Sequence, residues 1–436
     1  MGLDSRVNLR VWQIVTVLLL VVGYSGYYLC RSNLSVVAAR IVDELQSKGV
    51  EPADAKVRIG LIMSLGTLGY AVGKFLTGIA GDYLGGRRNF LGGMAGAVFF
   101  TVLFALGGGF PVFTLAWIGN RLVQSAGWSG MLKVSGRWFS YTSHGSILGV
   151  LSLSYLFGDA AAKAFMAELI GAGLGWRSIF LINAGILAGW FLLCLRFLKE
   201  SPRAIGAEEG TANPLNVYGQ SGNDPSSVGL LALIRPLVTS TSFWCVCLLS
   251  LALTLLRETF NNWTPLYFEG TVNLPPRTAA YVSAGFSFLG GCSVLLAGFL
   301  GDVLGKTGRA IIIVVGILLT SVALGLLSQT PPDRVLAGVV LVLLTGFLLI
   351  GPYSYLGGAV ALDFGGKRGG ATACGMIDGV GYLAGWLAGD SVARVVREWG
   401  WPTAFAVLAG VALASCAVAA VYWFLQTRPT QPLSES

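Results

Sequence analysis

Charged side chains are scarce in this chain of 436 residues. Asp, Glu, Lys and Arg make up 11% of it, while hydrophobic residues make up 54% and the mean hydropathy is +0.72. A soluble globular domain has about 25% charged residues, so the composition excludes one. The apolar runs are also too long and too uninterrupted for a membrane barrel, whose strands alternate over about ten residues. The chain is therefore predicted to be an all-α protein that crosses a membrane many times.

Residues that build common catalytic and metal sites are scarce as well. His144 is the only histidine and falls in a predicted loop, which excludes a multi-histidine metal site and leaves only that residue for a histidine-based triad. The seven cysteines lack the spacing of zinc sites. The chain has neither a Gly-rich phosphate loop ending in Lys-Ser/Thr nor a Gly-x-Ser-x-Gly elbow. We expect no metal and no cofactor, and an enzyme is the least favoured class.

Twelve apolar runs are long enough to span a bilayer, which takes about 20 residues. The predicted spans are 11–39, 57–81, 89–107, 112–133, 146–171, 176–197, 243–268, 278–301, 309–328, 334–359, 369–395 and 401–425. The first run is too long for the core of a signal peptide and is predicted to remain as a helix.

One long polar stretch, rich in Pro, Gly and Ser, separates the first six runs from the last six and predicts a flexible linker. The predicted organisation is a six-helix bundle over 1–197, a linker over 198–241, a second six-helix bundle over 242–426 and a tail over 427–436.

Lys and Arg are more frequent in the loops on the linker's side of the membrane, which is the bias of cytoplasmic loops. We therefore expect an integral membrane protein of a bacterial inner membrane, with the linker and both termini in the cytoplasm. The net charge of +8 then reflects topology, and nucleic acid is not an expected partner.

The two halves of the chain repeat. GIAGDYLGGRR at 78–88 matches GFLGDVLGKTGR at 298–309, which gives Asp82 and Asp302 equivalent positions. Parallel repeats of six helices place a substrate site between the halves, near the middle of the membrane.

The segment 78–88 resembles the signature loop of the major facilitator superfamily. The resemblance implies a major facilitator fold, with twelve transmembrane helices in two pseudo-symmetric six-helix bundles. It also implies that charged residues at this loop and its repeat hold the inner side closed. The residues expected to act in this gate are Asp82, Arg87, Arg88, Asp302 and Arg309. The alternative is a capped, solvated loop without a gating role.

Arg31 lies inside the first predicted span and Arg257 inside the seventh. A charged guanidinium at the middle of a membrane costs at least about 2.5–3.5 kcal/mol, and arginine does not lose its proton. Each must therefore face a polar cavity or an anionic partner, and the guanidinium suits carboxylate or phosphate. Tyr24 and Tyr28 share a helical face with Arg31, which marks a polar stripe or a packing seam between helices.

Asn261 lies one turn after Arg257 in the seventh span and is expected to contact the substrate. Glu258 could neutralise an arginine, although its Cβ atom points about 100° away from that of Arg257.

Two lysines and two acids within the predicted spans can form ion pairs. Asp159 and Lys163 have the i, i+4 spacing of a helical ion pair. Asp378 could pair with Lys74, accept a proton or contact the substrate. If both pairs form, one acid, Glu258, remains for two arginines. An anion with about 1.5–2 negative charges, such as a phosphate monoester, would complete the balance.

These residues lie in motifs that resemble the organophosphate:phosphate antiporters, the glycerol-3-phosphate and hexose-6-phosphate transporters of that superfamily. The matching pieces are GYSGYYLCRSN, GYAVGKF, QSAGW, RWFS, LRETFNNWTPLYF, GFLLIGPYSYLGG and GVGYLAG, spread over the whole chain. The resemblance implies that Arg31 and Arg257 bind phosphate, and that inorganic phosphate is exchanged for an organic phosphate by alternating access. The residues implied to support them are Lys74, Tyr24, Tyr28 and Tyr382.

The chain departs from that family at several positions. Ser32 stands where the glycerol-phosphate transporters have a lysine, and Tyr155 stands where they have a histidine and is expected to contact the substrate. Asp159, Lys163 and Asp378 are additions. The phosphate end of the site is therefore kept, while the organic moiety is left open. A carboxylate or a phosphonate could also use paired arginines.

Two further functions stay open. One is proton-coupled symport of an organic anion or sugar, with Asp378, Asp159 or Glu258 as the titrating group. The other is a transporter-like receptor for a sugar phosphate. The expected partners are a small anionic substrate, inorganic phosphate and the lipid bilayer. A monomer is expected because each chain holds a complete site.

Overall fold

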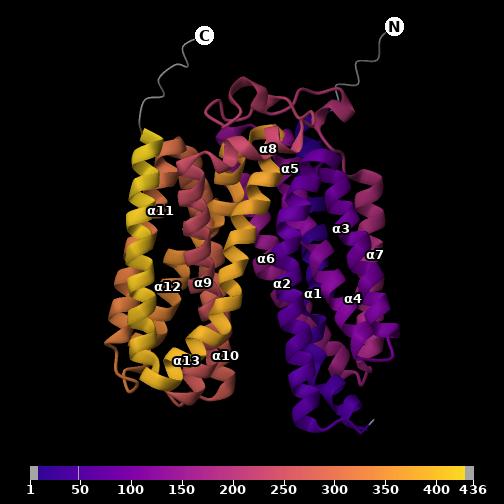
Figure 1. Cartoon of the computed structure of the whole chain (residues 1–436), viewed down its shortest axis with the longest axis vertical. Helices are drawn as coiled ribbons and strands as arrows, with labels where there is room; N and C mark the ends of the chain where they lie inside the picture. The colour runs from indigo at the N-terminus through magenta and orange to yellow at the C-terminus, as the bar shows by residue number, and fades with distance from the viewer. Residues whose placement is uncertain (1–7, 48, 428–436) are drawn as a thin grey trace.

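The structure is a computed structural model, and it describes residues 8–47 and 49–427. The regular elements of these residues are all helices, arranged in two bundles that stand side by side (Figure 1). The prediction of an all-α protein with two bundles is confirmed. The predicted tail, 427–436, lies outside the described residues beyond Thr427.

The first bundle contains α1 (Leu9–Ser47), α2 (Pro52–Leu84), α3 (Gly86–Leu106), α4 (Phe110–Gln124), α5 (Ala126–Trp138), α6 (His144–Gly171) and α7 (Trp176–Phe197), with the short η1 (Tyr141–Ser143) before α6. The second contains α9 (Thr241–Gly270), α10 (Pro276–Val303), α11 (Gly305–Ser328), α12 (Val335–Tyr355) and α13 (Ala361–Thr427), with the π-helical η4 (Leu356–Val360) between the last two.

The described helices account for the twelve predicted spans. Ten segments are long and apolar enough to cross a membrane. α4 and α5, interrupted only at Ser125, add an eleventh. The segment Val335–Gly385 counts as two, because the backbone leaves the helical conformation at Gly366 and Gly369. Gly400, with a φ of 77° that glycine adopts at little cost, separates the last two spans.

α1 runs past the predicted 11–39 and ends at Ser47. Ile41, in this extension, is buried in a cluster of apolar side chains. The carboxylate of Glu44 accepts hydrogen bonds from Arg177 and from the indole of Trp176 at the start of α7. These contacts continue the helix beyond the apolar run from which its length was predicted.

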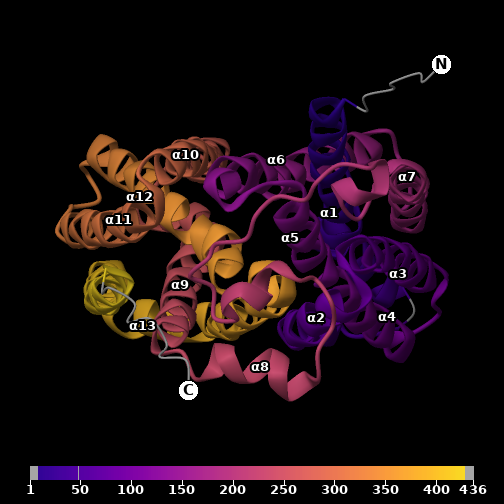
Figure 2. The ribbon, with the colours of Figure 1, turned by 90° about the horizontal axis from the view of Figure 1, so that it is seen from above.

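Two seams join the bundles. α2 packs against α13, and α6 packs against α10 (Figure 2). Glycines allow the helices to approach closely at both seams. A Cβ atom on Gly78 of α2 would lie 2.8 Å from the carbonyl oxygen of Ala371, and one on Gly298 of α10 would lie 2.5 Å from that of Gly145. Neither position has room for a larger side chain without movement of the backbone.

Each seam ends in a carboxylate that binds backbone amides of the other bundle. Asp82 of α2 accepts a hydrogen bond of 2.7 Å from the amide of Thr372, where α13 resumes after Gly369. Asp302 of α10 accepts bonds of 2.8 and 2.6 Å from the amides of Gly145 and Ser146 at the start of α6. The first amides of a helix lack partners within it and carry partial positive charge, so a carboxylate stabilises them. We call these contacts the carboxylate caps.

Two cations complete the carboxylate caps. Lys133 of α5 donates to Asp82 and to the backbone of the second bundle at Lys367. Arg309 of α11 donates to Asp302 at 3.0 Å and to Asp363 at 2.7 Å. Asn213 of the segment between the bundles donates to Asp363, the partner of Arg309, so the caps lie at the end of the molecule that carries this linker. We call it the linker end, and Figure 1 shows the linker there.

Arg87, another predicted gate residue, contacts its own bundle. Arg87 donates to the carbonyl oxygens of Leu195 and Leu198 at the end of α7. Neither Arg87 nor Arg88 takes part in a hydrogen bond between the bundles among the described residues. A gating role for the five named residues stays a prediction.

The linker is more structured than its composition predicts. It contains η2 (Pro202–Ile205), η3 (Gly219–Asn223) and α8 (Leu230–Val238), and it lies across the linker end (Figures 1 and 2).

Glu209 of the linker forms ion pairs with both bundles, to Arg137 of α5 and, at 3.5 Å, to Lys367 of α13. Burial alone would raise the pKa of Glu209, but the hydrogen bonds and charge of Arg137 outweigh it, and the pKa lies below its ordinary value. Asn213 adds a hydrogen bond of 2.9 Å to Asp363. The expectation of a flexible linker missed these contacts, because it considered only local composition.

We expect Gly78→Ala to weaken the α2–α13 seam, because the new Cβ atom would meet backbone rather than a flexible side chain. Overpacking of this kind costs about 1–3 kcal/mol. Cys374, buried beside the seam, should react faster with a water-soluble maleimide, as read by mass spectrometry of its peptide.

Gly410→Ala is the control for this substitution, because its Cβ atom would enter open space. Equal labelling of Cys374 in both variants would show that the close approach does not hold the seam together.

Candidate substrate-binding site

A cavity of about 940 Å³ lies between the two bundles. The hydrogen bonds that join the bundles in the described residues run from the Lys74–Asp378 pair to the linker end. These hydrogen bonds join the bundles between the cavity and the linker end, and none of those in the described residues joins them on the opposite side of the cavity.

Every residue predicted to bind substrate or balance charge lines this one cavity. From the first bundle these are Tyr24, Tyr28, Arg31, Lys74, Tyr155, Asp159 and Lys163, and from the second Arg257, Glu258, Asn261, Asp378 and Tyr382. The structure thus brings the twelve side chains together, while their roles stay predictions.

Arg31 of α1 offers its guanidinium to the cavity without a carboxylate partner in the described part of the chain. Its Nε atom donates to Gln124 at 3.0 Å, and one Nη atom donates to the hydroxyl of Tyr28 at 3.1 Å. The other Nη atom is buried and has no hydrogen-bond partner among the described residues. The guanidinium carbon lies 4.6 Å from the ring centre of Tyr28 and 4.8 Å from that of Tyr70, where cation–π attraction stabilises it. Arg31 therefore has one Nη atom without a hydrogen-bond partner in the described part of the chain.

Arg257 of α9 is bound differently. It donates to the carboxylate of Glu258, its neighbour in the sequence, and lies 3.5 Å from the hydroxyl of Tyr382. Its guanidinium carbon is 4.4 Å from the ring centre of Tyr353. The Cβ directions of the two neighbours predicted that they would point apart. Both side chains are long enough to bend into the cavity and meet there.

The two predicted ion pairs both form. Lys74 of α2 binds Asp378 of α13 at 2.7 Å, and this pair crosses between the bundles with side chains only 2% and 11% exposed. Lys163 and Asp159 of α6 lie 2.6 Å apart and are more exposed, and Ser32 donates a hydrogen bond to Asp159. These four charges compensate each other and leave the arginines as the source of excess charge.

Arg121 of α4 is a cavity residue that the sequence analysis overlooked. Its guanidinium carbon lies 4.8 Å from the ring centre of Tyr70, as far as that of Arg31 does. The available signal was the one that identified Arg31, namely an arginine inside a predicted span, here 112–133. With Arg121 included, five basic and three acidic side chains line the cavity, a formal excess of two positive charges.

Aromatic side chains form the wall nearest the linker end. Trp128 of α5 packs against Tyr24 and Tyr155, with ring centres 5.8 and 5.7 Å apart. Its indole donates a hydrogen bond of 2.8 Å across the bundles to the carbonyl oxygen of Gly357 in η4. The π-helical turn thus gives Trp128 a partner and fixes the aromatic wall.

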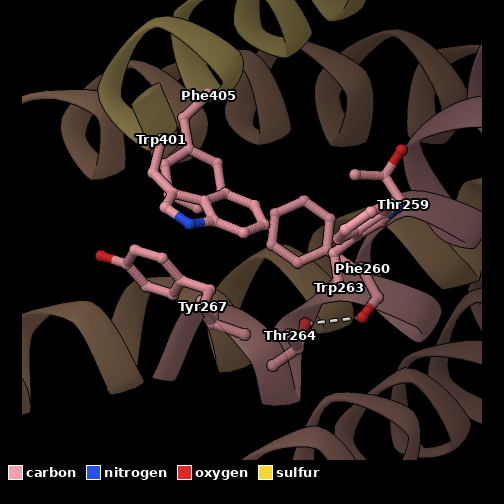
Figure 3. Close-up of a pocket in the computed structure, with 8 residues that line it drawn as sticks. Thr259, Phe260, Trp263, Thr264, Tyr267, Trp401 and Phe405 are labelled. Carbon is pink, nitrogen blue, oxygen red and sulfur yellow. Dashed lines mark hydrogen bonds between the residues drawn. The ribbon is translucent and has the colours of Figure 1, made fainter. Parts of the chain in front are cut away.

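A second pocket lies inside the second bundle (Figure 3). Trp263, Tyr267, Trp401 and Phe405 close around it, and about 10 Å³ remains, room for a single water molecule. An organic substrate does not fit there. Among the described residues, no group of three or more His, Cys, Asp or Glu side chains could hold a metal ion.

Comparison with known proteins assigns the chain to a class. The family model described as "Major Facilitator Superfamily" matches residues 20–389, and the chain belongs to this superfamily. The Escherichia coli fucose:proton symporter FucP has the same fold, with a TM-score of 0.71 at 12% identity over 95% of this chain and 99% of that one.

Two relatives indicate a family within this superfamily. A "Probable hexose phosphate transport protein" of Chlamydia muridarum is 24% identical, over 96% of this chain and 91% of that protein. The "Membrane sensor protein UhpC" of Salmonella typhimurium is 28% identical, over 92% and 89%. These relatives confirm the resemblance to the organophosphate:phosphate antiporter family.

We expect Asp378→Asn to destabilise the protein, because it leaves the buried ammonium group of Lys74 without a counter-charge. Removing one partner of a buried pair costs about 3–5 kcal/mol. The midpoint of thermal unfolding in detergent should fall, and adding Lys74→Met should restore much of the loss. A double variant no more stable than Asp378→Asn alone would contradict this account.

Proposed function

We propose that this protein exchanges an organic phosphate for inorganic phosphate by alternating access. The observation that carries the proposal is the arrangement of Arg31 and Arg257, which face one cavity from opposite bundles. The excess of two positive charges in that cavity matches a phosphate monoester, which carries about 1.5–2 negative charges near neutral pH. The relative named as a hexose phosphate transport protein supports the same substrate class.

The polar wall of the second bundle suits the organic part of such a substrate. Asn261, Asn262, Ser283 and Ser287 line the cavity and can donate to or accept from hydroxyl groups. A sugar phosphate or glycerol phosphate would place its phosphate at the arginines and its hydroxyl groups along this wall.

The positive charge of the cavity explains why transport would require exchange of two substrates instead of movement of one substrate alone. An anion bound by arginines of both bundles draws the bundles together and favours the occluded state. Without an anion, the same movement would enclose the guanidinium groups of Arg31 and Arg121 with no counter-charge, so the empty protein is held on one side. A ligand shifts a conformational equilibrium only through its different affinity for the two states, and the two arginines supply that difference.

The linker end faces the cytoplasm in this proposal, because its loops hold more Lys and Arg than the opposite side. The cavity then opens to the side of the membrane opposite the cytoplasm. The membrane in this proposal is the inner membrane of a bacterium. One chain contributes the whole site, so the working unit is a monomer.

A sugar-phosphate receptor is a second candidate, because one relative is named as a membrane sensor protein. Proton-coupled symport has less support, because Asp159, Glu258 and Asp378 are each bound to a cation.

The test is uptake of labelled inorganic phosphate into proteoliposomes, with and without phosphate inside. We expect uptake that requires internal phosphate and that falls at least about a hundredfold in Arg31→Lys and in Arg257→Lys, because the bidentate donors are lost. Competition by phosphate esters would then identify the organic substrate.

Two other results are informative. Phosphate binding without uptake by folded protein would favour the receptor. Uptake driven by a pH gradient without internal phosphate would overturn the proposed exchange.

A further inference from the structure

The three arginines of the cavity are not equivalent. Neither Arg31 nor Arg121 forms an ion pair with a carboxylate among the described residues, and both lie against the ring of Tyr70. Arg257 alone is held by an acid, Glu258. The excess positive charge is therefore concentrated on the first bundle, while the arginine of the second bundle is already neutralised.

Glu258 binds Arg257 as an anionic substrate would. A carboxylate and a phosphate both accept hydrogen bonds from guanidinium N–H groups, and both bind the same fork of donors. Arg257 and Glu258 are 11% and 23% exposed and line the cavity, so an incoming anion can reach the donor that Glu258 holds. The two anions compete for that donor.

We infer that Glu258 is an internal competitor of the substrate, an inference that rests on the proposed function. The substrate phosphate binds first at Arg31 and Arg121 and reaches the Nη2 donor of Arg257 only by displacing the Glu258 carboxylate. Glu258 is thus a positioning residue that acts through Arg257.

Displacement has two consequences for transport. Breaking the Arg257–Glu258 pair offsets part of the binding free energy, which keeps the affinity low enough for release. In the empty cavity, the same pair leaves Arg257 neutralised, so the second bundle presents no free cation until an anion arrives. The closing of the bundles is then linked to displacement of Glu258.

The test compares Glu258→Gln with Asp159→Asn. Each replaces a carboxylate of the cavity wall by an amide of similar shape, so each raises the formal charge of the cavity by one, but only the first frees Arg257. We expect Glu258→Gln to lower the Kd of inorganic phosphate about tenfold, measured by calorimetry on the purified protein. Both the maximal rate of phosphate exchange and its KM should fall, because the more tightly bound phosphate is released more slowly. Asp159→Asn should change Kd less than about threefold.

A double-variant cycle separates this role from a general effect on structure. In an Arg257→Gln background, Glu258→Gln should no longer improve phosphate binding, while the thermal unfolding midpoint shows that the variants are folded.

Equal gains from Glu258→Gln and Asp159→Asn would overturn the inference in favour of general electrostatics, and so would weaker binding by Glu258→Gln. The proposed function survives both results. If neither the unchanged protein nor Glu258→Gln binds phosphate, the proposed function and the inference fail together.

Discussion

A positive charge inside a membrane-spanning bundle needs a counter-charge, a polarisable face or water, and this requirement organises the centre of the molecule. Lys74 takes its counter-charge from the other bundle and so ties the two halves together. Lys163 lies near the accessible side of the cavity and is satisfied within its own helix. Arg31 and Arg121 rest on the ring of Tyr70, which attracts cations without neutralising them. Both arginines are thus stabilised without a carboxylate partner among the described residues, as the proposed binding of an anion requires.

Much of the fold and most of the site could be predicted from the sequence, for reasons that are local or that arise from the membrane. Lipid demands long apolar helices, so the spans follow from the lengths of the runs. A charged guanidinium within the membrane costs free energy, which predicted that Arg31 and Arg257 would face a cavity. Asp159 and Lys163 are four residues apart on one helix, which suffices to predict their pair. The Lys74–Asp378 pair spans 304 positions and was one of several options until the structure placed the helices.

The remaining features depend on how helices cross or on side-chain torsions. Gly78 matters because another backbone lies against it, which no pattern within α2 records. The pairing of Arg257 with Glu258 depends on several torsions beyond Cβ, so an argument from Cβ directions could not give it. Glu209 meets its partners only after both bundles have formed. Arg121, in contrast, could have been predicted from the sequence, because the rule that identified Arg31 applies to it without change.

The carboxylate caps have a consequence for the direction of movement. The α2–α13 and α6–α10 seams lie on opposite sides of the cavity, and each is fastened at the linker end by a carboxylate on the helix start of the other bundle. Parting one seam alone would twist the bundles and leave the other seam strained. A rotation that parts both together, about an axis through the middle of the two seams and parallel to the membrane, releases the caps simultaneously. In the proposed alternating access, the repeat in the sequence would favour such a rocking motion, because it places one carboxylate cap on each side of the axis.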